Sequence, residues 1–342
     1  MIWAFRALAA LALLAIAGLI YEALGEARDA KRFPSPGRLV DIGGRRMHLL
    51  CEDDHPGPTV VIEQGAGEPS LLWRAAQLRI AAFARVCLYD RPGYQWSPSV
   101  KGARSLQARA EDLYALLEAA GVPGPYVLVA HSYGGLIVRL FARSHADAVA
   151  GAVMVDAADE TIAFDRAYQR FAARVAPVLG LAEMAARLGV VRLWSELSPD
   201  REAEPESNPF VQGSLRAATV RPSFYAALAD DLRSIRTASE SLRAPGALGG
   251  LGDRPLVVVT HGQPFPGPFA FMERFWGEGQ KRMLALSSDH DLVVAENSNH
   301  MIVHDQPDLV VEQIRRVVEA VRDGRRLGGQ AELAPANSIS AG

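Results

Sequence analysis

The sequence predicts an α/β fold: a mostly parallel eight-stranded sheet with helices on both faces, an inserted helical lid and a hydrophobic N-terminal helix. From the third strand-like run onward, short apolar runs alternate with helical stretches of about 10 to 16 residues. The runs are apolar along their whole length, which is typical of strands buried on both faces of a parallel sheet. The alternation stops for one long stretch rich in Ala, Leu and Arg, and this interruption predicts the lid.

The individual elements follow from the same patterns in chain order. Gly43-Gly44 predicts a hairpin turn between the first two strands. The predicted strands are Arg38–Ile42, Met47–Cys51, Thr59–Glu63, Arg85–Tyr89, Tyr126–Ala130, Gly151–Val155, Pro255–Thr260 and Leu292–Glu296. The helices predicted around them are Leu71–Phe83, Ser105–Ala120, Gly134–Arg143, Phe269–Leu286 and the amphipathic Pro307–Arg322.

The N-terminal segment is predicted to form a hydrophobic helix that is removed from contact with water. Arg6 is its only charged side chain up to Tyr21, and Ala7–Ile20 is apolar without interruption. Extended to Leu24, the segment approaches the roughly 20 residues that span a bilayer. It is either a retained anchor, with the folded domain outside the cytoplasm, or a signal peptide cleaved near Ala23-Leu24-Gly25, which gives a secreted or periplasmic protein. A buried helix of a soluble fold is the third alternative.

Composition divides the chain into five segments. The membrane anchor or signal segment takes residues 1–25, and the core of the fold takes 38–156 and 252–325. The helical lid between the two core parts takes 157–251 and contains a polar break. The final segment, 326–342, is small, polar and aperiodic, and predicts a disordered tail.

Charge and motif content exclude several classes of function. The chain of 342 residues has 36 Lys and Arg against 39 Asp and Glu, so it lacks the basic field that nucleic acid requires. No group of Cys, His and carboxylates has zinc-like spacing, and no phosphate-binding glycine motif occurs, so neither metal nor cofactor is predicted. The only cysteines, Cys51 and Cys87, are either reduced core thiols or, in an exported chain, a permissible disulfide. The oligomeric state cannot be read from the sequence.

Ser132 is the predicted nucleophile. It lies in the segment Ala130–Gly135, where an apolar strand meets a helix. Small residues on both flanks allow the tight strand-to-helix bend that lifts a hydroxyl above the sheet, next to a helix N-terminus. Ala130 stands where the G-x-S-x-G pattern has its first glycine.

His300 is the predicted base, because a serine hydroxyl needs a base within hydrogen-bond reach near neutral pH. It follows the strand Leu292–Glu296 and therefore leaves the sheet at the same edge as Ser132. His131 is adjacent to the nucleophile and is expected to point away from it. His261 ends another strand near this edge and remains the alternative base.

Asp156 is the predicted acid that fixes the tautomer of the imidazole. It directly follows a buried strand, whereas no acidic residue lies between Asp253 and Glu273, after the next strand. The remaining alternatives are Asp289, Asp291 and Glu296. Acyl transfer also needs N–H donors for the developing oxyanion, and these are expected from Ala66, in a glycine-rich turn, and from Tyr133.

These motifs resemble the α/β-hydrolase family over residues 38–322. The matching pieces are the turn Gln64-Gly65-Ala66, where many members have His-Gly-x, the segment Tyr89–Ser97, the bend at Ser132, and Ser298-Asn299-His300. The resemblance implies the α/β-hydrolase fold with strand order 1-2-4-3-5-6-7-8.

The same resemblance bears on the disulfide and the acid. Its strand order implies that Cys51 and Cys87 lie on neighbouring strands, so a bridge is expected if the domain is exported. Members similar to haloalkane dehalogenases carry their acid after the sixth strand, which is the position of Asp156. Dehalogenases and epoxide hydrolases use an aspartate nucleophile, whereas Ser132 implies ester chemistry.

The predicted function is hydrolysis of a small-molecule carboxylic ester or thioester through an acyl-Ser132 intermediate. The alternatives are a non-catalytic, membrane-tethered binding protein with the same fold, or an amidase, peptidase, lipase or perhydrolase with the same triad. The aromatic residues of the lid are expected either to line an acyl pocket or to pack the lid itself; they are Phe164, Phe171, Trp194, Phe210, Phe224 and Tyr225.

Overall fold

A computed structural model describes residues 1–52, 55–198, 208–237 and 250–327. Its centre is an eight-stranded sheet in the order β1-β2-β4-β3-β5-β6-β7-β8. β2 runs antiparallel to β1 and β4, and the other neighbouring strands are parallel, which confirms the predicted fold class. Most of the predicted tail 326–342, from residue 328 on, lies outside the described residues, as does most of the polar break in the predicted lid, 199–207.

The strands begin and end within two residues of their predicted limits. In chain order they are β1 Arg38–Asp41, β2 Arg46–Glu52, β3 Thr59–Glu63, β4 Val86–Tyr89, β5 Tyr126–His131, β6 Val149–Val155, β7 Leu256–His261 and β8 His290–Ala295. All residues of β3 are buried, with Val61 in one layer of the core and Val60 and Ile62 in the other. Burial on both faces explains why the runs are apolar throughout.

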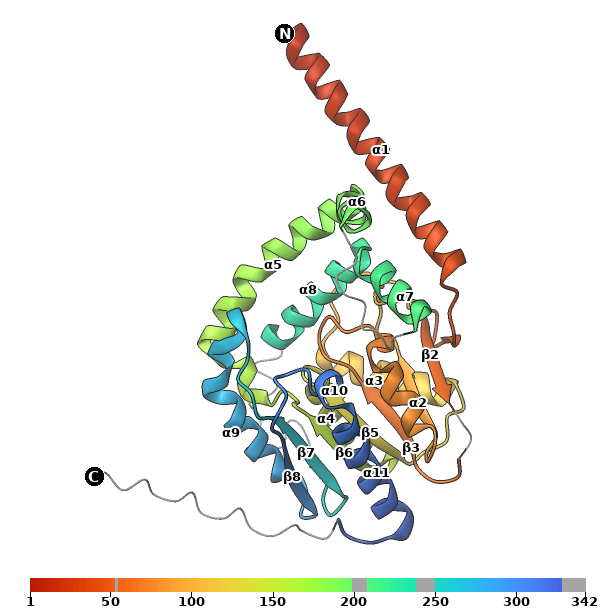
Figure 1. Cartoon of the computed structure of the whole chain (residues 1–342), viewed down its shortest axis with the longest axis vertical. Helices are drawn as coiled ribbons and strands as arrows, with labels where there is room; N and C mark the ends of the chain where they lie inside the picture. Colours follow the sequence, from red (N-terminus) through yellow and green to blue (C-terminus); the bar gives the residue numbers. More distant parts are fainter. Residues whose placement is uncertain (53–54, 199–207, 238–249, 328–342) are drawn as a thin grey trace, which may run out of the picture.

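Helices cover both faces of the sheet (Figure 1). On one face lie α3 Leu106–Ala119, α4 Gly134–Ser144 and α9 Glu273–Leu284, and on the other α2 Arg74–Ile80, α10 Ile302–Asp305 and α11 Pro307–Asp323. The predicted helix 71–83 is shorter in the structure, because its first turn is the 3-10 helix Ser70–Trp73. The predicted helix 269–286 likewise begins as a 3-10 helix, Gly267–Met272.

The segment predicted as a lid contains no strand among its described residues. Its helices are the 3-10 helix Glu160–Ala163, α5 Arg166–Arg187, α6 Val190–Leu197, α7 Pro209–Thr219 and α8 Pro222–Thr237. Helices α5 to α8 lie together on the side of the body where α1 is attached (Figure 1). Asp165 starts α5 by accepting hydrogen bonds from the N–H groups of Ala167 and Tyr168, both at 2.8 Å.

The N-terminal helix α1, Ile2–Arg32, is longer than the predicted segment 1–25. Its first part projects away from the body, and its later turns pack against α5, α6 and α7 (Figure 1). By length and composition it is able to cross a membrane. In the later turns of this helix Glu22 and Asp29 are buried against Arg192 of α6, an interaction that no local sequence pattern reveals.

Cys51 and Cys87 form a disulfide between neighbouring antiparallel strands. The two residues are directly paired in the register of β2 with β4. The bridge lies beside the helix-covered core, since Cys87 is fully buried. It closes a loop with a sequence separation of 36 residues.

Replacing both Cys51 and Cys87 with alanine is expected to lower the free energy of unfolding by about 3 to 4 kcal/mol, because a loop of this length gains that much freedom in the unfolded chain. Urea unfolding of the double variant and the wild type checks this value. Adding a reductant to the unfolding assay should weaken the wild type and leave the double variant unchanged. Equal unfolding midpoints for the two proteins would contradict the prediction.

Candidate active site

A sharp bend between β5 and α4 presents Ser132. Its φ of +50° is in the left-handed region, which a serine adopts only where the surroundings impose it. The two following glycines make room for the bend. A Cβ on Gly134 would lie 2.6 Å from the carbonyl oxygen of Glu63, and one on Gly135 would lie 2.7 Å from the Cβ of Ala157. Any larger residue at either position would push α4 away from the sheet.

Ser132, His300 and Asp156 lie in one hydrogen-bonded chain. Ser132 Oγ is 2.9 Å from His300 Nε2, and His300 Nδ1 is 2.6 Å from Asp156 Oδ2. The three side chains leave the carboxyl ends of β5, β6 and β8, so the parallel sheet brings them to one edge. Asp156 also has a positive φ, +41°, which marks a second sharp turn directly after its strand.

Two of the alternative acids lie at the opposite edge of the sheet. Asp289 and Asp291 are at the amino end of β8, whereas His300 follows its carboxyl end. Asp289 accepts hydrogen bonds from the N–H of Leu327 at 3.2 Å, and Asp291 pairs with Arg316 at 2.7 Å. Neither carboxylate reaches the imidazole of His300.

His261, the alternative base, contacts the acid rather than the serine. Its Nδ1 lies 2.7 Å from Asp156 Oδ2, the same oxygen that His300 contacts, and its Nε2 lies 3.3 Å from Glu273. Asp156 therefore accepts hydrogen bonds from two imidazoles. The pKa of His261 is raised, because its interactions with Asp156 and Glu273 outweigh the lowering effect of burial.

Burial acts on the pKa values of the acid and the base in different ways. Burial alone would raise the pKa of Asp156, but the hydrogen bonds from His261 and His300 outweigh it and hold the pKa well below its usual range. Burial lowers the pKa of His300, and the opposing hydrogen bond to Asp156 does not compensate. Asp156 is therefore ionised and His300 neutral at pH 7, which is the protonation state that a general base requires.

A second imidazole–carboxylate pair supports the loop that carries His300. His131 Nδ1 lies 2.6 Å from Glu68, and His131 Nε2 lies 2.9 Å from the carbonyl oxygen of His300. Burial would raise the pKa of Glu68, but the charge and hydrogen bond of His131 lower it to about 2. Sequence reasoning set His131 aside and missed Glu68, because nothing in the local pattern marks a carboxylate five residues after a strand as its partner.

Two backbone N–H groups remain available among the described residues, that of Ala66 in the turn after β3 and that of Tyr133 at the bend after β5. Neither Ala66 nor Tyr133 donates its backbone N–H to an acceptor within the described part of the chain. Neighbouring contacts hold the turn in place. The N–H of Gly65 donates to Glu68 at 2.9 Å, and the N–H of Gly67 donates to the hydroxyl of Tyr94 at 3.1 Å.

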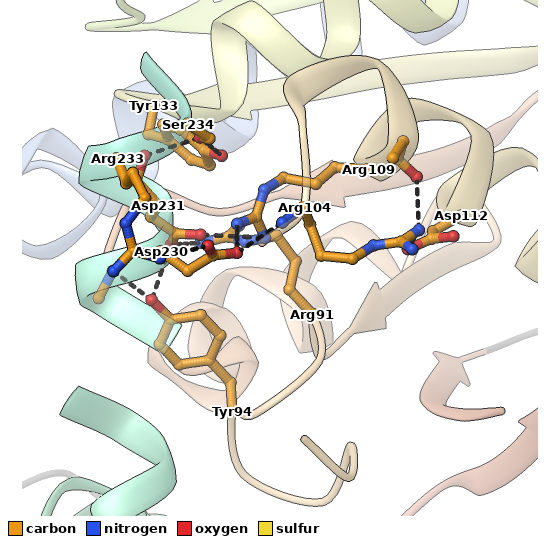
Figure 2. A network of polar contacts seen from close by, with 12 residues as sticks. Arg91, Tyr94, Arg104, Arg109, Asp112, Tyr133, Asp230, Asp231, Arg233 and Ser234 are labelled. Carbon is orange, nitrogen blue, oxygen red and sulfur yellow. Dashed lines mark hydrogen bonds and ion pairs between the residues drawn. The ribbon is translucent and has the colours of Figure 1, made fainter. Parts of the chain in front are cut away.

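Arg91 connects this turn to helix α8. Its guanidinium donates to the carbonyl oxygens of Gln64 at 2.8 Å and Gly65 at 2.7 Å, and it pairs with Glu63 at 2.6 Å. The same group reaches Asp231 on α8 at 3.0 Å, as Figure 2 shows. Arg91 is 2% exposed, so its ion pairs are shielded from water, and buried charges hold α8 against the turn.

The Arg91→Met variant is expected to lower the free energy of unfolding by about 3 to 5 kcal/mol, because Glu63 then stays buried without its cation. Arg233→Met is the matched control, since Arg233 pairs with Asp230 at 3.2 Å but is half exposed. That control should change the free energy of unfolding by less than about 0.5 kcal/mol. Urea unfolding measures both values. Similar losses of free energy of unfolding in the two variants would show that the buried ion pairs of Arg91 contribute no more to stability than an ion pair at the surface.

The lid aromatics do not act as one group. Trp194 is 67% exposed, so the expectation that it lines or packs the interior is wrong. Phe210 packs edge-on against Phe33, which follows α1, and Phe171 contacts Phe269 and Phe271. These contacts pack α7 against the end of α1, and α5 against the 3-10 helix Gly267–Met272.

The strand order, and the serine raised on the bend between a strand and a helix, define a protein of the α/β-hydrolase class. Residues 60–313 match the model of the alpha/beta hydrolase family. The chain belongs to this family.

Individual relatives are distant. A probable transporter of Hormonema carpetanum, efuK, is 29% identical over 315 residues, which cover 82% of this chain and 42% of the relative. The uncharacterized protein YqjL of Bacillus subtilis is 24% identical over 273 residues, covering 80% of this chain and 88% of the relative. This chain thus spans less than half of the first relative and most of the second.

Among solved structures, a thermophilic esterase from Thermogutta terrifontis has the same fold. It superposes with a TM-score of 0.59 at 23% identity, covering 83% of this chain and 98% of the esterase. At this identity the likeness concerns the fold alone.

Proposed function

We propose that the protein is a serine hydrolase that cleaves a carboxylic ester or thioester of a small molecule through an acyl-Ser132 intermediate. The observation that carries the proposal is the continuous chain from Ser132 through His300 to Asp156, with contacts of 2.9 and 2.6 Å. The serine at the nucleophile position favours acyl transfer over dehalogenation or epoxide opening, which the resembling enzymes perform with an aspartate.

Each residue has a defined part in the proposed reaction. His300 Nε2 takes the hydroxyl proton as Ser132 Oγ attacks the carbonyl carbon, and it returns the proton to the departing alcohol or thiol. Asp156 holds the proton on Nδ1 of His300 and stabilises the imidazolium. Water, activated by the same imidazole, then attacks the acyl-serine and releases the acid. No cofactor or metal takes part.

The backbone N–H groups of Ala66 and Tyr133 are the proposed donors to the oxyanion. Both lack an acceptor among the described residues, which leaves them available for a negative oxygen. We further propose that residues 157–251 are the lid over this site and that the core consists of 38–156 and 252–325. Arg91 would then align the oxyanion turn with the lid.

A labelled fluorophosphonate tests the proposal directly. The probe should react with the wild type, and mass spectrometry should locate the adduct on Ser132. Heat-unfolded protein is the control, because it still contains the Ser132 hydroxyl but no longer holds His300 next to it. No labelling of the folded protein, or an adduct elsewhere, would favour a non-catalytic binding protein with this fold.

The pH dependence of kcat/KM is expected to follow His300. Activity requires the neutral imidazole, so it should be present above the pKa of His300 and be lost as the pH falls through it. Burial places this pKa below the ordinary value of 6.5. For a neutral ester, kcat/KM should stay constant around pH 7 and fall about tenfold per unit only below the lowered pKa. An acid limb centred at pH 6.5 or above would contradict this expectation.

We also propose that α1 is a retained membrane anchor, with the amino terminus and Arg6 in the cytoplasm and the catalytic domain outside. Cleavage after Gly25 would remove Glu22, which accepts two hydrogen bonds of 2.9 Å from Arg192. The buried guanidinium would keep only Asp29, and losing one partner of a buried ion pair is costly. The interaction favours an uncut helix over a cleaved signal peptide.

A further inference from the structure

Helix α6 turns its apolar side chains toward solvent. Val190, Leu193, Trp194 and Leu197 follow the spacing i, i+3, i+4, i+7 and therefore share one face. They are 55%, 49%, 67% and 76% exposed. A surface helix of a water-soluble domain normally buries such a face, so this orientation requires an apolar partner.

The end of α5 continues this apolar surface. Val178, Leu181 and Met184 recur at intervals of three residues and are also exposed. Only Leu188 and Gly189 separate the two helices, which pack against each other. We call these three residues, together with the four of α6, the outer lid face.

The opposite side of α6 is polar and is locked onto α1. Arg192 is buried between Glu22 and Asp29, with contacts of 2.9 and 2.5 Å. Arg28 of α1 also pairs with Glu196 at 2.5 Å. These ion pairs fix the rotation of α6, so its apolar side chains cannot turn inward while α1 is in place.

The contact between α1 and the lid begins where the apolar part of α1 ends. Residues 2–20 are about 28 Å of helix at 1.5 Å per residue, close to the roughly 30 Å hydrocarbon core of a bilayer. Gly18 lies so near the turn between α5 and α6 that an added Cβ would be 2.3 Å from the carbonyl oxygen of Leu188. If residues 2–20 span the bilayer, this turn is therefore at the membrane surface, at the end of the body from which α1 projects (Figure 1).

We propose that the outer lid face is a second membrane contact, in which α6 and the last turns of α5 lie in the interfacial layer of the bilayer that α1 spans. An exposed Trp beside aliphatic side chains suits this layer, where amphipathic helices bury their apolar face. The inference rests on the proposed anchoring by α1 and is independent of the ester chemistry. It holds the lid, rather than the opposite end of the sheet, against the lipid.

Single-cysteine labelling of the full chain in phosphatidylcholine vesicles tests the proposal. Because both native cysteines form the disulfide, a new cysteine is the only free thiol for an environment-sensitive fluorophore. Leu193→Cys reports on the outer lid face, Leu11→Cys on the exposed apolar part of α1, and Glu278→Cys on an exposed site of α9. The labels at 193 and 11 should show blue-shifted emission and be quenched by spin-labelled lipid, whereas the label at 278 should show neither effect.

The outcomes separate this inference from the anchoring on which it rests. A lipid-quenched label at 11 with a water-exposed label at 193 would overturn the inference but would agree with the proposed membrane anchor. Water-like emission at both sites would overturn both. Blue-shifted emission at 193 without quenching by lipid would mean that a second copy of the chain or another protein covers the face, which also overturns the inference. If Leu193→Cys does not fold, Leu197→Cys on the same face decides the question in its place.

Discussion

Replacing Ser132 with alanine is expected to reduce kcat for ester hydrolysis about 10⁶-fold, the scale of loss when a serine nucleophile is removed from a working triad. The variant keeps His300 and Asp156, so any remaining rate reflects water attack in the same site. KM should change far less than kcat, because the hydroxyl contributes to the transition state rather than to substrate binding. Steady-state kinetics with a chromogenic ester measures both constants.

Ser99→Ala is the matched control, since Ser99 is an exposed serine outside the hydrogen-bonded chain. It should retain wild-type kcat and KM. Equal activity of Ser132→Ala and the wild type would eliminate the acyl-Ser132 intermediate. The circular dichroism spectra of both variants should match that of the wild type, so that loss of activity is not loss of fold.

The Asp156→Asn substitution is expected to lower kcat about 10⁴-fold. An asparagine amide is able to donate a hydrogen bond to His300 Nδ1, and the imidazole would then carry its proton on Nε2. That nitrogen faces Ser132 at 2.9 Å and would no longer accept the hydroxyl proton. His300 would keep its position beside Ser132, but its Nε2 could no longer act as the base.

The matched control is Asp291→Asn, which changes an alternative acid at the opposite edge of the sheet, where it pairs with Arg316. Its kcat should remain at the wild-type level. If instead Asp291→Asn loses activity and Asp156→Asn keeps it, the assignment of the acid is overturned.

The positions of Ser132, Asp156 and His300 at the candidate site were predictable because each residue follows a strand of the sheet. A serine, an aspartate and a histidine that come after different strands of one parallel sheet meet at its carboxyl edge, whatever their separation in the sequence. Ser132, Asp156 and His300 were found in this way, and so was His261. Sequence reasoning offered His261 as a base, but strand position alone does not tell which partner a side chain contacts.

The supporting contacts were not predictable, because they join distant segments without any local signature. Glu68 beside His131, and Asp231 beside Arg91, become partners only when the turn after β3 and helix α8 pack on the core. The orientation of α6 was hidden for a related reason. Its amphipathic spacing is visible in the sequence, but periodicity does not reveal whether the apolar face meets protein, lipid or water.

The Cys51–Cys87 bridge has a practical consequence for producing the protein. Disulfides persist in oxidising compartments and are rare where thioredoxin and glutathione keep thiols reduced. Expression in the cytosol of an ordinary bacterial host would yield a dithiol form that lacks the link between β2 and β4. Protein for activity assays is best expressed with export to the periplasm or through a eukaryotic secretory pathway. The number of free thiols should be measured before a lack of activity is interpreted.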